Sequence, residues 1–400
     1  MNNIQPLKGF RDFLPKEAKK RLWLKSQIEA EFKLWGFEPM ETPTLEPLEL
    51  FVGQIGEDEQ LFFRFKDNAD RDVALRYDQT VPTCRVVGTY SQSLPMPFRR
   101  YQIQPAFRAE KPQRGRYREF VQCDADIFGE DSYIADAEVI ALSLSIYKRL
   151  GFKNVCVLVN DRELLSGVPY EAIVAIDKLE KTGQVGVIRD MIDKGIKREI
   201  AIEFFKKVKG LQPNEKIINI FKYLKDMGFE EDWYRFEPTL SRSFSYSTGP
   251  IWEVKINGSS GGSVLGGERY DALVEKISGQ KIPGTGFGLG FDRTLEACEE
   301  FGLIPDLERE GVMVITMDGV DAEEGMKIVR KLREVGMAVE MYPSLSAKFD
   351  KKLRYANKKG IAYVAILGET EIKQGKVSLK DMKTGEQEIL SVEGMVKKLI

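Results

Sequence analysis

Residues 107–129, FRAEKPQRGRYREFVQCDADIFG, decide the fold around the functional site, because they read as two strands joined by a strongly basic loop. Five basic residues lie within eleven of these positions: Arg108, Lys111, Arg114, Arg116 and Arg118. Like charges on paired strands repel each other. A hairpin with this many basic residues therefore predicts that an external polyanion binds it. Arg108 is suited to a phosphate, which a guanidinium binds through two parallel hydrogen bonds. A surface hairpin balanced by acids elsewhere in the chain is the alternative.

The rest of this hairpin supplies further candidate contacts. On an extended strand, Glu110 faces the same side as Arg108, and its carboxylate can accept from a base amino group or hold a metal ion. The ring of Phe120 can stack on a purine. Alternation in the second strand places four side chains on one face: Phe120, Gln122, Asp124 and Asp126. We therefore expect a sheet with a polar working surface.

A second glycine-rich segment, GTGFGLGFDR (284–293), predicts a strand with one bare face. It does not match the dinucleotide-binding pattern G-x-G-x-x-G, because position 289 is Leu. Arg293 follows at the start of a helix, where its guanidinium can lie over a purine ring while its N–H groups reach a phosphate.

The composition excludes several classes of chemistry. The chain has 60 Lys and Arg against 62 Asp and Glu, a formal net charge of −2, which excludes a generally basic nucleic-acid coat. It contains no histidine, so Ser-His-Asp or Cys-His catalysis and a histidine metal site are excluded. We therefore expect the chemistry to depend on carboxylates, arginines, lysines, backbone dipoles or a bound metal ion.

The four cysteines, Cys84, Cys123, Cys156 and Cys298, lie far apart and are expected to be reduced and buried. The N-terminus has no apolar segment typical of a secretory signal, and no apolar run reaches the length of a membrane span. We therefore expect a cytoplasmic protein that does not enter a membrane.

The order of predicted elements indicates an α+β fold. Leu24, Ile28 and Phe32 lie on one face of a helix that Gly36 ends. Strand-like runs follow at 61–65, 73–77, 99–103, 106–110 and 119–128, then a helix over about 133–150. A charged helical insertion begins near Asp161, strand-like sequence resumes at 243–256, and a strand and helix follow at 284–302. The sheet is therefore interrupted and then completed.

Beyond about Glu310, strands and helices alternate, which predicts a small α/β domain. Its strands are expected at 312–317, 338–342 and 363–368, with helices near 321–335 and 345–358. Six basic residues gather in the second helix: Lys348, Lys351, Lys352, Arg354, Lys358 and Lys359. They form either a solvated helix face or an RNA-contacting patch.

Together these segments resemble the class II aminoacyl-tRNA synthetases, and specifically the histidyl-tRNA synthetase family, over nearly the whole chain. KGFRDFLP (8–15) is similar to the family's opening signature, and Pro43 lies where its dimer-forming first motif has a proline. The FRAE and RGRYREF stretches resemble the second motif, and GFGLGFDR (286–293) resembles the third. Five other segments resemble family regions in the family order: LRYDQTVP (75–82), VNDRELL (159–165), AIDKLEKTG (175–183), LSRSFSYSTGPIWEV (240–254) and YPSLSAKFDKKLRYANKKGIAYVAILGETE (342–371).

The resemblance implies a six-stranded antiparallel catalytic sheet, a helical insertion and a C-terminal α/β anticodon-binding domain. The expected boundaries are 1–160 for the first part of the catalytic core, 161–232 for the insertion, 233–308 for the second part and 309–400 for the anticodon-binding domain. The implied reaction is activation of histidine by ATP to histidyl-adenylate, then transfer to the 3′ end of tRNA(His). Mg²⁺ is expected with ATP, and the chain is expected to form a homodimer.

The resemblance also implies roles for single residues. Arg108, Arg242 and Arg293 would be catalytic: Arg108 holds the α-phosphate of ATP, and Arg242 approaches the carboxylate and α-phosphate in place of a metal ion. Glu110 would lie near the adenine, which stacks between Phe120 and Arg293. Arg116 would contact pyrophosphate, and Asp78, Thr80 and Gln122 would hold the amino group. Asp126 would meet a ring nitrogen of the imidazole, and Tyr246 and Ser247 would also belong to the amino-acid site. No residue is assigned to a protein-bound metal.

One departure concerns the imidazole. The family's strand usually reads D-Y-Y-T-G, whereas here it is Ser245-Tyr246-Ser247-Thr248-Gly249. Ser247 therefore replaces the tyrosine that commonly bonds the ring, and a serine hydroxyl reaches several ångströms less far. A water or a shifted strand would be needed to compensate, and altered amino-acid specificity is the alternative.

Two other functions compete with the synthetase. The regulatory subunit of ATP phosphoribosyltransferase is a catalytically silent relative that binds a partner enzyme. Such relatives generally lack the anticodon-binding domain and some ATP-binding residues, whereas this chain retains both. An RNA-binding protein that kept the fold and lost charging activity is the more distant alternative.

Overall fold

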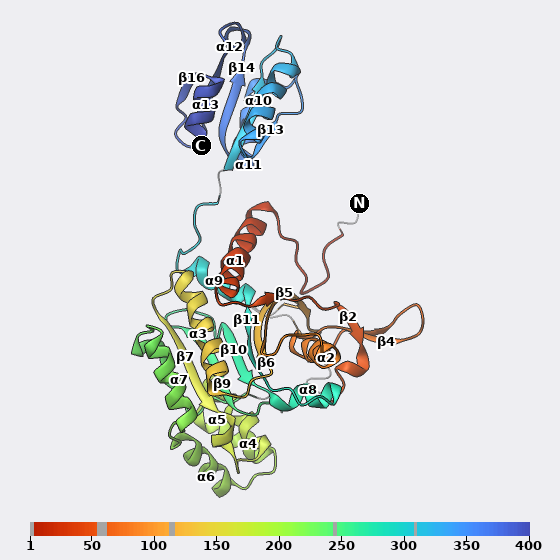
Figure 1. The fold of residues 1–400 in the computed structure, drawn as a ribbon, viewed down its shortest axis with the longest axis vertical. Coiled ribbons are helices and arrows are strands. Elements are labelled where there is room, and N and C mark those ends of the chain that lie inside the picture. Colours follow the sequence, from red (N-terminus) through yellow and green to blue (C-terminus); the bar gives the residue numbers. More distant parts are fainter. Residues whose placement is uncertain (1–3, 54–61, 112–116, 243–245, 308–309) are drawn as a thin grey trace. The chain divides into compact units, whose positions relative to one another are not determined.

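The computed structural model describes residues 4–53, 62–111, 117–242, 246–307 and 310–400. They divide into two compact units, Met1–Leu303 and Ile304–Ile400, each built around its own main sheet (Figure 1).

The main sheet of the first unit has eight strands in the order β1-β5-β6-β11-β10-β9-β7-β8. Their bounds are Glu38–Pro39 (β1), Phe98–Phe107 (β5), Glu119–Phe128 (β6), Gly284–Gly290 (β11), Leu265–Arg269 (β10), Pro250–Ile256 (β9), Val155–Asp161 (β7) and Tyr234–Phe236 (β8). All pairings among the inner six are antiparallel, and the two short edge strands pair in parallel. The six-stranded antiparallel core is confirmed, and the edge strands extend it.

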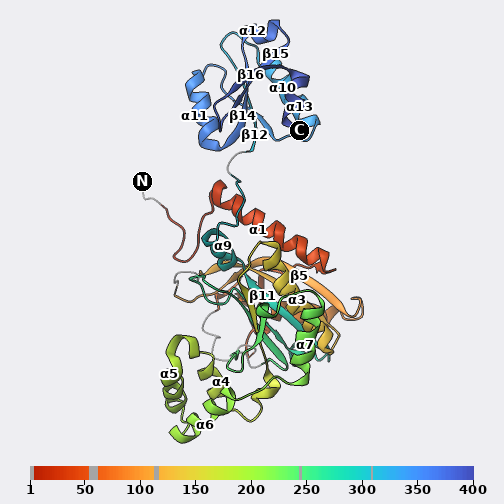
Figure 2. The ribbon, with the colours of Figure 1, turned by 90° about the vertical axis from the view of Figure 1, so that its left-hand side faces the viewer.

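Three helices cover one face of this sheet: α1 (Pro15–Leu34), α3 (Tyr133–Arg149) and α9 (Phe291–Glu300) (Figure 2). The apolar positions predicted for the first helix, Leu24, Ile28 and Phe32, are fully buried. Phe32 lies 6.2 Å from the ring of Phe287 on β11. Gly36 ends the helix with a φ of +73°, a conformation that glycine adopts at little cost.

On the opposite face, α2 (Thr80–Tyr90) and α8 (Asp271–Ser278) pack together over one end of the sheet. Their core includes Cys84, Val87, Leu273 and Val274, together with Phe128 of β6. A small sheet lies beside them, with strands β2 (Leu45–Pro47), β4 (Asp72–Leu75) and β3 (Arg64–Lys66) in that order. The rest of this face carries the candidate site.

A buried ion pair joins the helix layer to the sheet. Arg269, the last residue of β10, donates from Nε to both carboxylate oxygens of Asp136 on α3, at 2.9 and 3.1 Å. Its Nη1 atom donates to Asp271 at 3.0 Å, and both side chains of the Arg269–Asp136 pair are at most 3% exposed. Burial raises the pKa of Asp136 to about 6, against the opposing effect of Arg269.

We expect Arg269→Met to lower the free energy of unfolding of the first unit by about 3–5 kcal/mol, because it leaves the Asp136 carboxylate buried without its cation. Urea unfolding monitored by circular dichroism measures this loss. Arg235→Met is the control, since Arg235 is 63% exposed and lies 3.9 Å from its acidic partner. A loss below about 1 kcal/mol for Arg269→Met would contradict the assignment.

The predicted insertion contains α4 (Tyr170–Ile176), α5 (Leu179–Asp193) and α6 (Arg198–Lys209), which share a separate hydrophobic core (Figure 2). The next helix, α7 (Glu215–Asp226), packs instead against α3. It leads to β8, which joins the edge of the main sheet beside β7. The insertion core is therefore built from the first three of these helices, while α7 extends the helix layer.

Several strand predictions were too long, among them the run 73–77, whose strand β4 ends at Leu75. The run 106–110 leaves the ladder after Phe107, and the backbone N–H of Arg118 bonds to Gly9 of the N-terminal segment at 3.0 Å. Within the run 243–256, the strand begins only at Pro250. Just before it, the backbone N–H of Thr248 donates to the carbonyl oxygen of Arg269 in a turn. Residues 243–245 lie outside the described part of the chain.

The second unit has a five-stranded sheet in the order β13-β12-β14-β15-β16. Its strands are Glu310–Thr316 (β12), Val339–Met341 (β13), Ile361–Leu367 (β14), Lys376–Asp381 (β15) and Gln387–Ser391 (β16). Its helices are Ala322–Glu334 (α10), Phe349–Lys359 (α11), Glu369–Lys373 (α12) and Val392–Leu399 (α13). The alternating parallel part was predicted, whereas the antiparallel β15–β16 pair was not.

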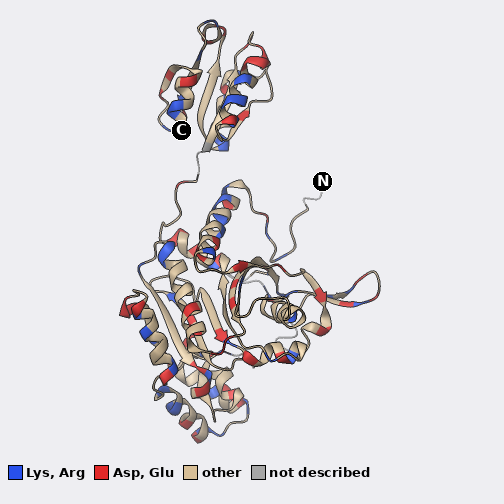
Figure 3. Cartoon of the chain, viewed as in Figure 1, with Lys and Arg blue, Asp and Glu red and all other residues tan. Residues whose placement is uncertain are grey.

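The basic residues predicted on the second C-terminal helix do not all share one surface. Lys352 is 2% exposed, and its Nζ donates to the carbonyls of Thr316 and Leu345 at 2.8 and 3.0 Å. It therefore secures α11 to the sheet and does not belong to a solvated face or an RNA patch. The other five side chains are exposed, and Asp350 is the one acidic residue between Lys348 and Lys359. Over the second unit as a whole, basic and acidic residues are mixed (Figure 3).

Candidate active site

The glycine-rich strand β11 has one bare face, as the sequence predicts. Thr285, Phe287 and Leu289 are buried and alternate with glycines. A Cβ on Gly286 would lie 2.0 Å from Asp126 Oδ1, and one on Gly288 would lie 2.7 Å from Gln122 Nε2. The side chains of β6 therefore lean over β11 into space that only glycine leaves open.

The polar row predicted on β6 is confirmed in register. Asp126 pairs with Gly286, Asp124 with Gly288 and Gln122 with Gly290. Asp124 Oδ1 and Gln122 Oε1 are buried and have no hydrogen-bond partner among the described residues. Burial raises the pKa of Asp124 well above its usual range. Buried polar atoms without partners are costly, so this part of the sheet is suited to a polar ligand.

Asp126 is held by two residues that the sequence did not single out. Its Oδ1 accepts from the hydroxyl of Tyr270, and its Oδ2 forms an ion pair with Arg100, which is fully buried. Burial raises the pKa of Asp126, and the charge of Arg100 opposes that shift. The carboxyl group is therefore fixed in direction at the edge of Gly286.

Arg108 lies just after the end of β5, between two aromatic rings. Its guanidinium carbon is 5.1 Å from the ring centre of Tyr77 and 5.0 Å from that of Phe120. These two ring contacts limit the orientations of the Arg108 guanidinium and hold its N–H groups at the end of the sheet. In this structure, Phe120 contacts the guanidinium that was expected to hold the phosphate.

The strand-based argument for Glu110 was wrong, because β5 ends at Phe107 and Glu110 lies in a bend. The Glu110 carbonyl accepts from Arg118 Nε at 3.0 Å. Arg116, expected near pyrophosphate, lies outside the described residues.

The N-terminal segment supports the base of this loop. Arg11 lies with its guanidinium carbon 3.2 Å from the ring centre of Tyr117, and its Nη2 donates to Asp292 at 2.9 Å. Asp292 also accepts from Arg21 of α1 at 2.6 Å. One buried carboxylate thus connects the opening signature, α1 and the first turn of α9.

Arg293 lies one residue further along α9, beyond the end of β11. Its Nη1 donates to the carbonyl of Ser263 at 2.8 Å. Gly290, which ends β11, pairs with Gln122 near the start of β6. Phe120 is near the start of β6, and Arg293 shortly follows the end of the neighbouring strand β11. The two residues therefore lie at the same end of these paired strands.

Arg242 and Ser247 converge on a residue absent from the sequence prediction, Glu268 of β10. Arg242 Nε donates to Glu268 Oε1 at 3.1 Å, and the Ser247 hydroxyl donates to Glu268 Oε2. A Cβ on Gly266 would lie 2.1 Å from Arg242 Nη1, so the guanidinium lies against another bare glycine. Tyr246 is buried and packs edge-on to Tyr270, with ring centres 6.4 Å apart.

Asp78 lies at the start of α2, where Thr80 is the first helical residue. Its Oδ1 accepts from the backbone N–H of Val81 at 3.3 Å, and the side chain is buried. Burial raises the pKa of Asp78 to about 6, with opposing effects from Arg108 and Arg100. These electrostatic contacts place Asp78 among the arginines of the same site.

From the role in amino-group binding that the family resemblance implies for Asp78, we expect Asp78→Asn to weaken histidine binding at least about tenfold, because a charged hydrogen bond contributes about 1.5–3 kcal/mol. The pKa of Asp78 is higher in the native state than in the unfolded chain, so the native state holds this proton more tightly. The contribution of Asp78 to the free energy of unfolding therefore falls as pH rises from 3.8 to about 6. The variant should therefore be up to about 3 kcal/mol more stable than the parent at neutral pH, and equally stable below about pH 4.

Calorimetric histidine titration and urea unfolding at several pH values measure these two effects. Asp70→Asn is the matched control, since Asp70 is an exposed loop residue with a φ of 60° that asparagine also adopts. Unchanged histidine affinity in Asp78→Asn would contradict the role of Asp78.

The sequence missed Glu268, Arg100, Tyr270 and Tyr77. Tyr77 stands in LRYDQTVP (75–82), a segment that resembles a family region, whereas Glu268, Tyr270 and Arg100 lie outside the segments that the sequence marked as functional. Their roles depend on contacts between strands distant in sequence, which alternation on a single strand does not reveal.

Three further findings concern the cysteines, acidic clusters and helix apolarity. All four cysteines are free and buried, as predicted. Within the described ranges, no group of three or more Cys, Asp and Glu side chains is arranged to hold a metal ion. None of the helices in the described part of the chain combines the length and apolarity needed to cross a membrane.

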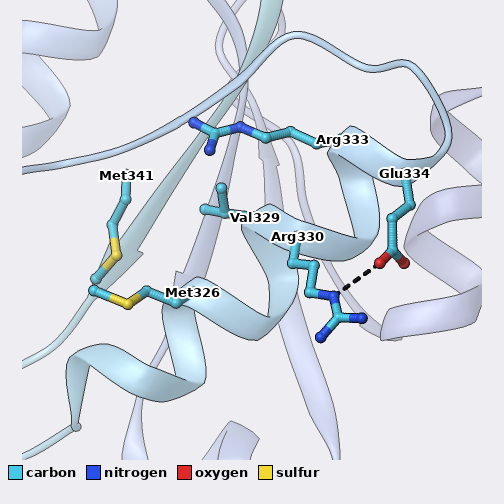
Figure 4. A pocket seen from close by; sticks show the side chains of 6 residues that line it. All are labelled: Met326, Val329, Arg330, Arg333, Glu334 and Met341. Atoms are coloured by element: carbon cyan, nitrogen blue, oxygen red, sulfur yellow. Dashed lines mark hydrogen bonds and ion pairs between the residues drawn. The ribbon is translucent and has the colours of Figure 1, made fainter.

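A groove of about 610 Å³ lies in the second unit and is lined by α10 and β13 (Figure 4). Its walls are Met326, Val329, Arg330, Arg333, Glu334 and Met341. It therefore lies outside the catalytic sheet.

Comparisons with known proteins agree with this geometry. Residues 9–191 match the family model described as histidyl-tRNA synthetase, and residues 311–400 match the model described as anticodon binding domain. The chain is 35% identical to a histidine–tRNA ligase of Christiangramia forsetii, covering 97% of both chains. It is 36% identical to one of Wolinella succinogenes, covering 98% of this chain and 97% of the relative.

Solved structures show the same fold. A histidyl-tRNA synthetase from Nostoc sp. PCC 7120 superposes with a TM-score of 0.84 at 25% identity, covering 100% of this chain and 99% of that one. A protein from Bacillus halodurans C, described as an ATP phosphoribosyltransferase regulatory subunit/histidyl-tRNA synthetase, gives 0.75 at 24% identity over 92% of this chain and 99% of its own.

Proposed function

The chain belongs to the histidyl-tRNA synthetase family, and we propose from this membership and the site that it is a histidine–tRNA ligase. It activates histidine with ATP and then transfers the histidyl group to the 3′ end of tRNA(His). The observation that carries this proposal is the match to a histidine–tRNA ligase over 97% of both chains. In the same sheet, Arg108 directly follows β5 and Arg242 bonds to Glu268 of β10.

In the first step, the histidine carboxylate attacks the α-phosphorus of ATP and pyrophosphate leaves, giving histidyl-adenylate. Negative charges meet at the reacting phosphorus, so fixed positive groups stabilise the transition state. Arg108 binds the α-phosphate, held in direction by the rings of Tyr77 and Phe120. Arg242 binds the carboxylate and α-phosphate, with its Nε fixed by Glu268.

The other site residues position the two substrates. The adenine stacks between Phe120 and Arg293, with Glu110 near it, while Arg116 binds pyrophosphate. Asp78, Thr80 and Gln122 bind the amino group of histidine, and the unpartnered Gln122 Oε1 supports this assignment. Asp126 binds the imidazole, and Tyr246 bounds the amino-acid site.

In the second step, a terminal ribose hydroxyl of tRNA attacks the histidyl carbonyl and AMP leaves. The chain has no histidine to act as base, so we assign the hydroxyl proton to a phosphate oxygen of the adenylate. Mg²⁺ accompanies ATP as part of the substrate, because Mg²⁺ is usually bound by substrate phosphates together with one or two protein carboxylates.

We further propose a cytoplasmic homodimer, formed through the segment around Pro43. Pro43 and its neighbour Thr44 are exposed, and Leu45 is 40% exposed. The domain boundaries expected from the sequence remain part of this proposal.

Aminoacylation of purified tRNA(His) with radiolabelled histidine tests the function. A histidine ligase yields histidyl-tRNA that depends on ATP and tRNA(His). Binding of histidine without any charging would favour the regulatory-subunit alternative. Binding of tRNA without histidine binding or charging would favour an RNA-binding protein.

A further inference from the structure

Glu268 stands on the catalytic face beside the position expected for the histidine ring. It lies on β10, is 5% exposed, and pairs in register with Gly286 of β11. Gly286 pairs on its other side with Asp126 of β6. Two buried carboxyl residues therefore flank one bare glycine, with Cα atoms roughly 9–11 Å apart across two antiparallel pairings.

The Glu268 carboxylate is held from two sides. One oxygen accepts from Arg242 Nε at 3.1 Å, and the other accepts from the hydroxyl of Ser247. An ionised carboxylate has about four acceptor positions, so each oxygen retains capacity for a further donor. The group is thus oriented by the protein without being saturated by it.

The surroundings of Glu268 belong to the amino-acid end of the site. Burial raises the pKa of both Asp78 and Tyr246, and the charge of Glu268 adds to each of these shifts. Asp78 is the residue proposed to bind the substrate amino group. A ligand whose amino group reaches Asp78 therefore has Glu268 and Asp126 within the same part of the sheet.

We propose that Glu268 is a specificity-determining residue whose carboxylate binds one nitrogen of the substrate imidazole while Asp126 binds the other. This inference rests on the proposed function and names how that site recognises histidine. Ser247 then acts by orienting Glu268 and does not reach the ring itself. The short serine side chain needs no compensating water or strand shift.

The chemistry of the ring matches this arrangement. A protonated imidazole is flat and carries an N–H donor on each of two edges, so it can lie over Gly286 and donate to both carboxyl groups. An amino acid with a flat ring but no ring nitrogen would leave both buried groups without a partner. Such a site rejects the analogue strongly, because unpaired buried polar groups cost affinity.

Binding of histidine, Nτ-methylhistidine and Nπ-methylhistidine to the free protein by calorimetry tests the role of Glu268. The parent protein should bind histidine more tightly than either methylated form, since each blocks one ring nitrogen. Glu268→Ala should weaken histidine binding about 10- to 100-fold. Glu268→Ala should weaken binding much less for the form methylated on the nitrogen that faces Glu268. The variant should therefore no longer distinguish histidine from that methylated form. Glu268→Gln keeps the size and one acceptor oxygen, and should be intermediate.

Glu253→Ala is the matched control. Like Glu268, Glu253 favours the charged form of Arg242 through its own negative charge, which raises the pKa of Arg242 against the opposing effect of burial. It lies on β9, however, and pairs in register with Gly266, not with Gly286. Its removal should leave the ratio of affinities for histidine and the methylated forms unchanged.

Retained discrimination in Glu268→Ala would overturn the proposal. So would unchanged histidine affinity with a loss of turnover only, because that result assigns Glu268 to the positioning of Arg242. A parent protein that binds histidine selectively but does not charge tRNA would refute the proposed function, while the calorimetry would still decide the role of Glu268. A parent protein that does not discriminate among the three ligands refutes the inference itself.

Discussion

Arg108→Gln should lower the rate of histidine-dependent ATP–pyrophosphate exchange by about 10³-fold, the magnitude found when a transition-state arginine is lost in phosphoryl transfer. The guanidinium is held between the rings of Tyr77 and Phe120, with Nε 3.4 Å from the Tyr77 carbonyl. It therefore meets the α-phosphate without reorganisation, which is the condition under which a fixed charge is most effective. Arg108→Lys should recover little, because an ammonium cannot form the paired hydrogen bonds of the fork.

Arg99→Gln is the control for Arg108→Gln. Arg99 is on β5, the strand that ends just before Arg108, but it faces the helix layer, where it pairs with Glu138 of α3. Its loss should change the exchange rate by less than about threefold, since a partly exposed ion pair contributes little. Exchange in Arg108→Gln above about a tenth of the parent rate would contradict a direct role in the transition state.

Gly286→Ala should reduce the kcat/KM for histidine by more than about 100-fold. The added Cβ would lie 2.0 Å from Asp126 Oδ1 and 2.6 Å from the carbonyl of Ala125. The backbone cannot yield without opening the β11–β6 pairing, so Asp126 must leave its place beside the proposed imidazole site. Such overpacking also costs about 1–3 kcal/mol of stability. Histidine titration of the exchange rate, together with urea unfolding, separates the two effects.

Gly261→Ala provides the comparison. A Cβ at Gly261 meets only the hydroxyl of Ser259, at 3.7 Å, which is an ordinary contact. This variant should keep the parent KM for histidine. A Gly286→Ala protein with a parent-like KM would show that the bare face of β11 is not needed for amino-acid binding.

The sequence predicted those features that repeat along one element. Leu24, Ile28 and Phe32 predicted the buried face of α1, and the glycines of β11 predicted its bare side. Alternation from Gln122 to Asp126 predicted the polar row on β6. In each case the spacing of residues within a single helix or strand carries the information.

The sequence could not predict contacts made across elements. Glu268 joins Arg242 and Ser247 only because β10 lies next to the turn before β9, and Arg269 reaches Asp136 only through packing of α3 on the sheet. Lys352 reads as one more basic residue on an exposed helix, yet its ammonium group is buried against two carbonyls. Strand ends were also missed, since Phe107 ends β5 where the N-terminal segment takes over the pairing.

ATP–pyrophosphate exchange, measured separately with each of the standard amino acids, tests most directly whether this arginine and carboxylate site activates histidine. The account predicts strong exchange with histidine and only background exchange with the others. Exchange that is strongest with a different amino acid, or absent with all of them, would contradict it.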